Sequence, residues 1–302
     1  MKKMLFLINP YAGMRKGSKA LTEILGEFNR AEFDVRVYVT AGQGDAVTAV
    51  QTLGADMDLV VCCGGDGTFN ETITGLLQAG LDIPVGYIPS GSTNDFAASL
   101  GLPADPVAAA RQIVDGTPNR YDAGKFNQRY FSYVASFGAF TKASYSTPQS
   151  VKNMLGHLAY LLEGVQELPQ LKKHHVKLTL DDNEVLEDDY LFGAICNSTS
   201  VGGIMTLDPK QVDLRDGKFE VLLIRVPKSL QEIPECLLAV QKQQYNSAMM
   251  TFRTAAHITV EAESEMPWTL DGEKEEGHPR IEIENLHGAI TIIQKDEEAD
   301  DV

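Results

Sequence analysis

The sequence has few cysteines for its 302 residues, and the four it has, Cys62, Cys63, Cys196 and Cys236, form no C-x-x-C pair. Neighbouring residues of a β-strand point to opposite faces, so Cys62 and Cys63 are not expected to form a disulfide with each other. Free cysteine commonly serves as a small buried apolar residue, and disulfides are rare in reducing compartments. We therefore interpret all four as buried residues of a protein from a reducing compartment.

Long hydrophobic runs are missing as well. No stretch approaches the roughly 18 apolar residues that identify a membrane-spanning helix. The apolar run after Lys2-Lys3 ends at Asn9-Pro10, so it is shorter than the apolar core of a secretory signal, roughly 7 to 15 residues. These absences predict a cytoplasmic protein with no transmembrane segment.

Positive charge is scarce too. The chain has 26 Lys and Arg against 42 Asp and Glu, which gives a formal net charge of −16. Such a surface repels phosphates over most of its area, so we exclude a nucleic-acid-binding protein. A nucleotide needs only a local site and stays compatible with this charge. The hydrophobic fraction of 43% is that of a soluble globular protein with a substantial core.

The first hundred residues alternate between two patterns. Short apolar runs predict buried strands, and apolar residues repeated at i, i+3, i+4 and i+7, as in Leu21, Ile24, Leu25 and Phe28, predict helices. Strands are expected at 4–8, 35–39, 59–63 and 85–88, and helices at 21–28, 44–53, 68–78 and 94–100. Repeated βα units form a parallel sheet covered on both faces, and ligands bind at the carboxyl ends of its strands.

The pattern changes after about residue 120. Alternating apolar residues predict antiparallel strands, and Asp-Gly pairs are typical of hairpins. The strands are expected at 129–136, 176–180, 219–226, 257–263 and 280–284, the hairpins at 216–217 and 271–272, and helices near 150–166 and 228–244. We predict an α/β domain over 1–121, rejoined by 288–302, and a mainly antiparallel β-sandwich over 122–287.

Residues 60–71 read VVCCGGDGTFNE, an apolar strand that runs into a glycine-rich turn and a helix start. Glycines let the backbone approach an anion, to which the helix N-terminus offers N–H groups. The turn is no P-loop, because G-x-x-x-x-G-K-[ST] is absent, and Asn70 replaces the last glycine of the dinucleotide pattern. Asp66 would repel phosphates unless a cation intervened, so the turn suggests a magnesium nucleotide and phosphoryl transfer. The alternative is an ordinary turn in which Asp66 caps a helix.

Other polar turns lie at the same predicted edge of the sheet. NPYAG at 9–13 follows the first strand, Thr40 follows the second, and PSGSTND at 89–95 follows the fourth. Because the carboxyl ends of parallel strands meet at one edge, all these turns could line one site.

Taken together, NPYAG (9–13), GGDGTFNE (64–71), PSGSTNDFA (89–97), YDAG (121–124) and LDGE (270–273) resemble the soluble bacterial lipid kinases of the diacylglycerol kinase catalytic-domain family, which is related to sphingosine and ceramide kinases. The resemblance extends from residue 4 to about 293. GGDGT alone also resembles NAD kinases and phosphofructokinases, whereas its combination with NP-x-AG and LDGE is specific.

The resemblance implies a fold like that of NAD kinase and diacylglycerol kinase, with ATP and Mg²⁺ as cofactors. It implies transfer of the γ-phosphate of ATP to a lipid hydroxyl, with diacylglycerol converted to phosphatidic acid as the simplest case. The lipid would be met transiently at the inner membrane face, where the enzyme would be peripheral, and a homodimer is compatible with this reading. The apolar segment 151–171 and the basic cluster 172–175 could touch that membrane.

Site residues follow from matching this sequence to the family's motifs. The implied nucleotide-binding residues are Asn9, Pro10, Ala12, Gly13, Thr40, Gly64, Gly65, Asp66, Gly67, Thr68, Phe69, Asn70, Glu71, Ser92 and Asn94. Asp271 would be the general base, with Asp66 as the rival, and Asp95, Asp122 and Glu273 would complete an acidic network with Asp66. A structural Mg²⁺ would be held by Asp213, Asp216 and the carbonyl of Lys218.

This chain departs from the family at two places. The family's G-T-x-N-D pattern is replaced by Gly91-Ser92-Thr93-Asn94-Asp95, in which Ser92 keeps a hydroxyl. The basic residue that follows NP-x-AG in the family is matched only loosely, by Arg15 and Lys16, so the cation that contacts the phosphates stays open.

Two other functions are compatible with a glycine-rich turn of this kind. A soluble-metabolite kinase of the NAD-kinase type is disfavoured by LDGE and by the lack of a second Asn-Glu pair in the middle third of the chain. A non-catalytic nucleotide-binding regulator is disfavoured because a sensor has no need for both Asp66 and Asp271. Without the resemblance, Asp271-Gly272 is a plain hairpin turn, and Asp213 and Asp216 belong to a solvated turn.

Overall fold

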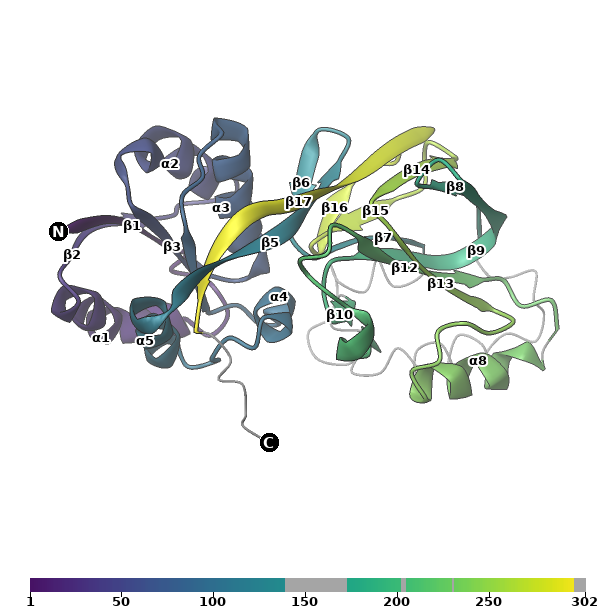
Figure 1. Ribbon diagram of the computed structural model, residues 1–302, viewed down its shortest axis with the longest axis horizontal. Coiled ribbons are helices and arrows are strands. Elements are labelled where there is room, and N and C mark those ends of the chain that lie inside the picture. Colours follow the sequence, from purple (N-terminus) through teal and green to yellow (C-terminus); the bar gives the residue numbers. More distant parts are fainter. Residues whose placement is uncertain (139–172, 202–204, 230, 296–302) are drawn as a thin grey trace. The chain divides into compact units, whose positions relative to one another are not determined.

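The computed structural model describes residues 1–138, 173–201, 205–229 and 231–295, which belong to two compact units (Figure 1). Unit 1 consists of Met1–Ala123 together with Gly288–Val302, and unit 2 of Gly124–His287. The chain passes between them in two strands, β5 (Thr117–Phe126) and β17 (Arg280–Gln294). The helix predicted near 150–166 lies outside the described residues.

Unit 1 is built on a parallel sheet, as the sequence predicts. The strands are β1 (Lys2–Ile8), β2 (Phe33–Val39), β3 (Leu59–Gly64) and β4 (Val85–Pro89), in the order β4-β3-β1-β2, with β17 parallel to β4 on its other side. The helices are α1 (Lys16–Arg30), α2 (Asp45–Leu53), α3 (Asp66–Ala79), α4 (Asp95–Ser99) and α5 (Pro106–Asp115). In Figure 1, α1 and α5 lie on one side of this sheet and α2 and α3 on the other.

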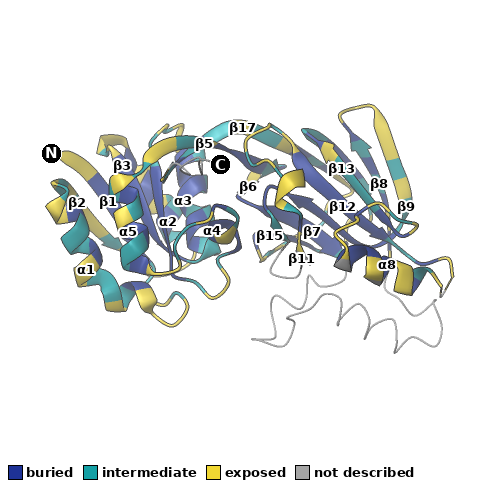
Figure 2. Ribbon diagram, turned by 60° about the horizontal axis from the view of Figure 1, so that its bottom comes forward, coloured by how far each residue is buried: buried dark blue, intermediate teal, exposed yellow. Residues whose placement is uncertain are grey.

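The composition of the strands explains the layers of unit 1. Strands β3 and β4 are buried over their whole length because helices cover both faces. One face of the sheet packs on α1 and α5, where Phe6, Ile24, Phe28 and Ile113 share a core. Figure 2 shows exposed residues on the outward faces of these helices and buried residues on the strands beneath.

The sequence patterns missed one helix of unit 1. Helix α5 carries a clear start signal, since Asp105 at its N-cap accepts the N–H of Ala108 at 2.8 Å and Pro106 occupies the first turn. Short runs of alanine give that segment a weak apolar pattern, so apolar periodicity alone does not predict the helix.

Unit 2 is a sandwich of antiparallel strands, as predicted. Its strands are β6 (Arg129–Phe131), β7 (Val134–Gly138), β8 (His174–Leu180), β9 (Glu184–Cys196), β10 (Ser200–Val201), β11 (Met205–Thr206), β12 (Phe219–Arg225), β13 (Met250–Ala255), β14 (His257–Ala262), β15 (Trp268–Leu270) and β16 (Glu273–Glu275), with helix α8 (Glu232–Gln241). The first half of β9 pairs with β8, and its second half lies between β7 and β12. The core contains Phe137, Phe219 and Trp268.

Two strand predictions need correction. The single strand expected over 129–136 is interrupted at Ser132 and Tyr133, which separate β6 from β7. The Asp-Gly pair at 216–217 makes no hairpin, because the strand after it, β12, pairs with β9 and β13. The pair at 271–272 is a two-residue hairpin between β15 and β16, and its φ angles of 50° and 84° fit a type I′ turn.

All four cysteines are free and buried, as predicted, and burial raises the pKa of the Cys63 thiol to about 11. No helix among the described residues is long and apolar enough to cross a membrane.

Candidate active site

The glycine turn joins β3 to α3 through one residue. Strand β3 ends at Gly64, Gly65 is the N-cap, and α3 begins at Asp66, two residues earlier than predicted. Gly65 has no side chain, so no N-cap side chain accepts the N–H groups of the first turn. A helix N-terminus of this kind suits an anion such as a phosphate.

The turn after β4 packs directly on the glycine turn. A side chain at Gly91 would place its Cβ 2.6 Å from Cα of Gly65, so both positions need glycine for this approach. The N–H of Ser90 donates to the carbonyl of Gly64 at 2.7 Å. Asn94, at φ 55°, accepts the N–H of Gly91 at 2.8 Å and donates to its carbonyl at 3.1 Å. The predicted contact residue Asn94 therefore holds its own turn closed.

The turn after β1 completes the group. Asn9 donates from Nδ2 to the hydroxyl of Thr68 at 3.1 Å. A side chain at Gly13, which has φ 50°, would place its Cβ 2.5 Å from the carbonyl oxygen of Ser90. We call residues 9–13, 64–68 and 90–95 the three-turn cluster. Its turns lie at one edge of the sheet, where ligands bind in such folds.

Side chains at the rim of this cluster differ in exposure. Pro10 and Ala12 are half-buried, whereas Ser92, Arg15 and Lys16 are exposed. Thr40, after β2, is buried, and both its N–H and its hydroxyl donate to the carbonyl of Ile8, at 2.9 and 3.3 Å.

The carboxylate of Asp66 points to the start of α4. Its Oδ2 accepts the N–H of Asp95 at 3.1 Å, and its Oδ1 accepts the N–H of Phe96 at 3.4 Å. The hydroxyl of Tyr87 also reaches Oδ1, at 3.5 Å. Asp66 does cap a helix, but that helix is α4 and not its own. The carboxylates of Asp66 and Asp95 consequently belong to neighbouring turns of the cluster.

Two of the implied nucleotide-binding residues hold helix α3 in place through contacts with other elements of unit 1. Phe69 is fully buried and stacks on Tyr87 with ring centroids 4.4 Å apart. Glu71 accepts the N–H of Gly44 at 2.7 Å and of Ala46 at 3.2 Å, so its carboxylate caps the start of α2. Nothing in the local sequence pattern indicated these distant partners.

Asp122 lies on β5 in unit 1 and is fully buried. Its Oδ1 accepts the N–H of Gly288 at 2.7 Å, which ties β5 to the C-terminal segment of the unit. Glu273, on β16 in unit 2, lies beside Arg129, with 3.7 Å between the charged groups.

Asp271 stands at the first position of the hairpin turn in unit 2 and is 6% exposed. Its Oδ2 accepts the N–H of Ser132 at 2.6 Å, and its Oδ1 accepts those of Tyr133 and Val134 at 3.0 Å each. These three bonds explain why residues 132–133 leave the predicted strand. Hydrogen bonds from N–H groups favour the ionised carboxylate and fix its orientation.

The residues implied in a structural metal site lie on the exposed turn 213–218 of unit 2. Asp213 accepts the N–H of Arg215 at 3.0 Å, and Asp216 accepts that of Lys218 at 2.8 Å. Behind them, burial raises the pKa of Glu220 to about 8, and the charges of Asp216 and Asp213 add to this rise. Hard carboxylate oxygens suit Mg²⁺. Within the described part of the chain, however, no three His, Cys, Asp or Glu side chains converge as a metal would require.

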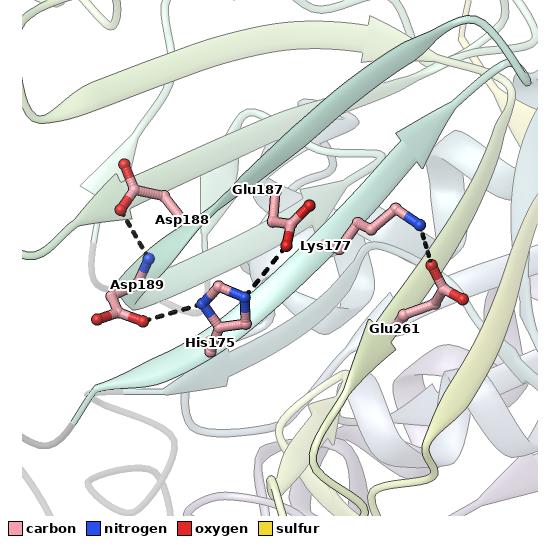
Figure 3. Close-up of polar contacts among 6 residues, drawn as sticks. All are labelled: His175, Lys177, Glu187, Asp188, Asp189 and Glu261. Atoms are coloured by element: carbon pink, nitrogen blue, oxygen red, sulfur yellow. Dashed lines mark hydrogen bonds and ion pairs between the residues drawn. The ribbon is translucent and has the colours of Figure 1, made fainter.

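Two residues of the predicted basic cluster at 172–175, Lys173 and His175, lie beside acidic side chains, and Figure 3 shows the contacts of His175. Lys173 pairs with Asp189 at 2.5 Å, and the two ring nitrogens of His175 lie 3.1 Å from Asp189 and 3.3 Å from Glu187. These bonds raise the pKa of His175, that with Asp189 most strongly. The apolar segment 151–171 lies outside the described residues.

Comparisons with known proteins agree with this architecture. Residues 3–126 match the family model described as the diacylglycerol kinase catalytic domain, and residues 134–294 match the YegS C-terminal NAD kinase beta sandwich-like domain. The chain is 30% identical over 302 residues to a diacylglycerol kinase of Bacillus subtilis, covering 99% of both chains. It is 32% identical over 274 residues to one of Staphylococcus saprophyticus, covering 90% of this chain and 89% of the relative.

Solved structures give the same picture. A diacylglycerol kinase structure from Bacillus anthracis matches with a TM-score of 0.75 and 25% identity, over 98% of this chain and 97% of that one. An NAD kinase from Archaeoglobus fulgidus in complex with ATP matches with a TM-score of 0.51 and 14% identity, over 98% of this chain and 94% of that one. The second likeness shows a common fold alone.

Proposed function

This chain belongs to the diacylglycerol kinase catalytic-domain family, and from that premise we propose that it transfers the γ-phosphate of ATP to the hydroxyl of diacylglycerol, which yields phosphatidic acid. The observation that carries the proposal is the three-turn cluster, in which Gly65 and Gly91 approach closely beside an uncapped helix N-terminus. Phosphoryl transfer needs positioning and neutralisation of charge more than covalent chemistry from the protein.

In this proposal the three-turn cluster binds ATP. The first-turn N–H groups of α3 receive phosphate oxygens, and the lack of side chains at Gly64 and Gly65 lets the phosphates come close. Asn9 and Thr68 support the turn through their shared hydrogen bond. Phe69 and Glu71 contribute by holding α3 against Tyr87 and α2 rather than by contact.

The magnesium that the family implies fits the chemistry of this cluster. Bound Mg²⁺ would neutralise charge on the transferred phosphoryl group. Asp66 and Asp95 are the carboxylates that could hold it, since they lie on adjacent turns and Mg²⁺ takes one or two carboxylates together with phosphate oxygens. A separate structural cation site is proposed on the 213–218 turn, at Asp213, Asp216 and the carbonyl of Lys218.

For the acceptor we propose Asp271 as the general base. A base must be ionised and oriented before reaction, and three N–H donors provide both conditions for this carboxylate. The same donors lower the proton affinity of the carboxylate, so Asp66 remains the alternative candidate for the general base. Asp122 and Glu273 are proposed as outer members of the acidic network.

The test is a transfer assay that leaves the acceptor open. Purified protein is supplied with γ-labelled ATP and Mg²⁺, with diacylglycerol, ceramide, a sphingoid base, total extracted lipid or NAD⁺ in parallel. Label in phosphatidic acid is expected. Label in NADP⁺ alone would support the metabolite-kinase alternative, and ATP binding without transfer to any acceptor would support the regulator.

A further inference from the structure

Strand β2 (Phe33–Val39) ends the sheet of unit 1 with an edge that no other described strand covers. Figure 1 shows it at the outer side of the sheet, and among the described strands it pairs with β1 alone. All seven of its residues pair with β1 in one unbroken register, so the open edge is as long as the strand. Such an edge presents N–H and C=O groups that another strand can bind.

The usual protections of an edge strand are missing from β2. Natural proteins blunt such edges with proline, lysine, a β-bulge or a very short strand. The sequence of β2, FDVRVYV, contains neither proline nor lysine, and its pairing with β1 has no bulge. It is rich in the β-branched and aromatic residues that favour strands, and Val37 and Val39 are 40% and 56% exposed. This edge is therefore suited to pairing.

The two charged residues of β2 have opposite signs and are two positions apart. Asp34 and Arg36 consequently share one face of the strand. Both are exposed, and neither forms an ion pair with another described residue. Charges of one sign would repel a second copy of this strand, whereas opposite charges at this spacing are complementary to the same pair on a second copy.

This complementarity selects one register. When two β2 strands run antiparallel and are centred on Val35, Asp34 of each copy lies opposite Arg36 of the other. Phe33 then lies opposite Val37, which covers apolar surface that is exposed in the single chain. Strands centred on Asp34 or on Arg36 would instead place two like charges opposite each other, which is unfavourable.

We propose that the β2 edge is the interface of a homodimer, in which two copies of this chain pair their β2 strands antiparallel about a twofold axis at Val35. Such an interface uses the same surface on both copies, as is usual in twofold dimers. The sheets of the two α/β units then form one continuous sheet. This inference adds an assembly to the proposed function and does not depend on it.

The test measures the monomer–dimer equilibrium of the whole chain by sedimentation over a range of concentrations. Asp34→Arg and Arg36→Asp each reverse one exposed charge and so place like charges opposite each other twice in the dimer. Asp115→Arg is the matched control, because Asp115 is exposed at the end of α5, which packs on β4 on the far side of β3 and β1 from β2.

We expect the wild type and Asp115→Arg to dimerise alike, and each β2 variant to raise the Kd of the dimer by about tenfold or more. An equimolar mixture of Asp34→Arg and Arg36→Asp should dimerise again, because one copy then carries two positive charges and the other two negative ones. The chain that carries both substitutions should also dimerise, because it exchanges the charges without losing their complementarity.

A wild type that stays monomeric would overturn the proposal. A dimer that neither β2 variant weakens would overturn it as well, because the interface would then lie elsewhere. Weakening in both variants without recovery in the mixture or in the double variant would contradict the antiparallel register. None of these results bears on the proposed kinase reaction, which the transfer assay judges separately.

Discussion

The carboxylate of Asp271 accepts the backbone N–H of Ser132 at 2.6 Å, although the two residues are 139 positions apart in the sequence. The same carboxylate binds the next two N–H groups, of Tyr133 and Val134. It therefore joins the hairpin between β15 and β16 to the gap between β6 and β7. Asp271 has a structural role whatever its role in catalysis, and experiments on it must separate the two.

Asp181 offers a matched control for Asp271. It follows β8 as Asp271 follows β15, has φ 48°, and accepts the N–H groups of Ala256 and His257 at 2.9 Å each. Asp271→Ala should lower the free energy of unfolding by about 1–3 kcal/mol, because buried donors lose their acceptor, and Asp181→Ala should cost less, because its two bonds are exposed and water can replace them. Denaturant titration measures this loss.

Turnover distinguishes the two variants. If Asp271 is the base, Asp271→Ala lowers kcat by about 10²- to 10⁴-fold under conditions where the protein stays folded, and Asp181→Ala does not. Equal, small losses of turnover would leave Asp271 as a structural residue and make Asp66 the next candidate for the base.

The contact between Gly65 and Gly91 gives a second prediction. A Cβ at Gly91 would lie 2.6 Å from Cα of Gly65 and 2.7 Å from Oδ1 of Asn94. Gly91→Ala should therefore push the two turns apart, cost about 1–3 kcal/mol of stability and weaken ATP binding in calorimetry. Gly42→Ala is the control, because a Cβ there meets nothing within 4 Å. Unchanged ATP affinity in Gly91→Ala would remove the three-turn cluster from the nucleotide site.

His175 gives a prediction for the dependence on pH. Its bonds to Asp189 and Glu187 raise its folded-state pKa above 6.5. The stabilisation from the charged imidazole is then fully present below pH 6.5 and is lost as the pH rises through the raised folded-state pKa. NMR titration should show Asp189→Asn lowering the pKa of His175. A pKa of His175 that is the same in Asp189→Asn as in the wild type would show that the His175–Asp189 pair drawn in Figure 3 does not form in solution.

The architecture of unit 1 could be predicted because its signals are local. Apolar runs such as 59–63 become strands buried on both faces, and each polar turn follows its strand directly. The approach of the turns could be expected as well, since parallel strands end at one edge. The pairing of individual atoms could not, because Asn9 and Thr68 meet only through the order of β1 and β3 in the sheet.

Hydrogen bonds between carboxylates and backbone groups far away in the sequence could not be predicted from local patterns. Glu71, a residue of α3, caps the start of α2. Asp271 accepts the N–H of Ser132 and so interrupts the segment 129–136, whose alternating apolar residues predict one continuous strand. The buried state of Glu220 could not be predicted either, because a charged residue in an alternating strand normally faces solvent. In each case the partner lies far along the chain, and only the folded arrangement brings it within reach.

The central claim is that this chain phosphorylates diacylglycerol. It is tested most directly by product stoichiometry, with purified protein, ATP, Mg²⁺ and diacylglycerol in mixed micelles, and with phosphatidic acid and ADP quantified from the same reaction. The account predicts one phosphatidic acid for each ADP formed, and loss of both products together in Asp271→Ala. ADP formed without phosphatidic acid, or no ADP with diacylglycerol but phosphorylation of NAD⁺, would contradict it.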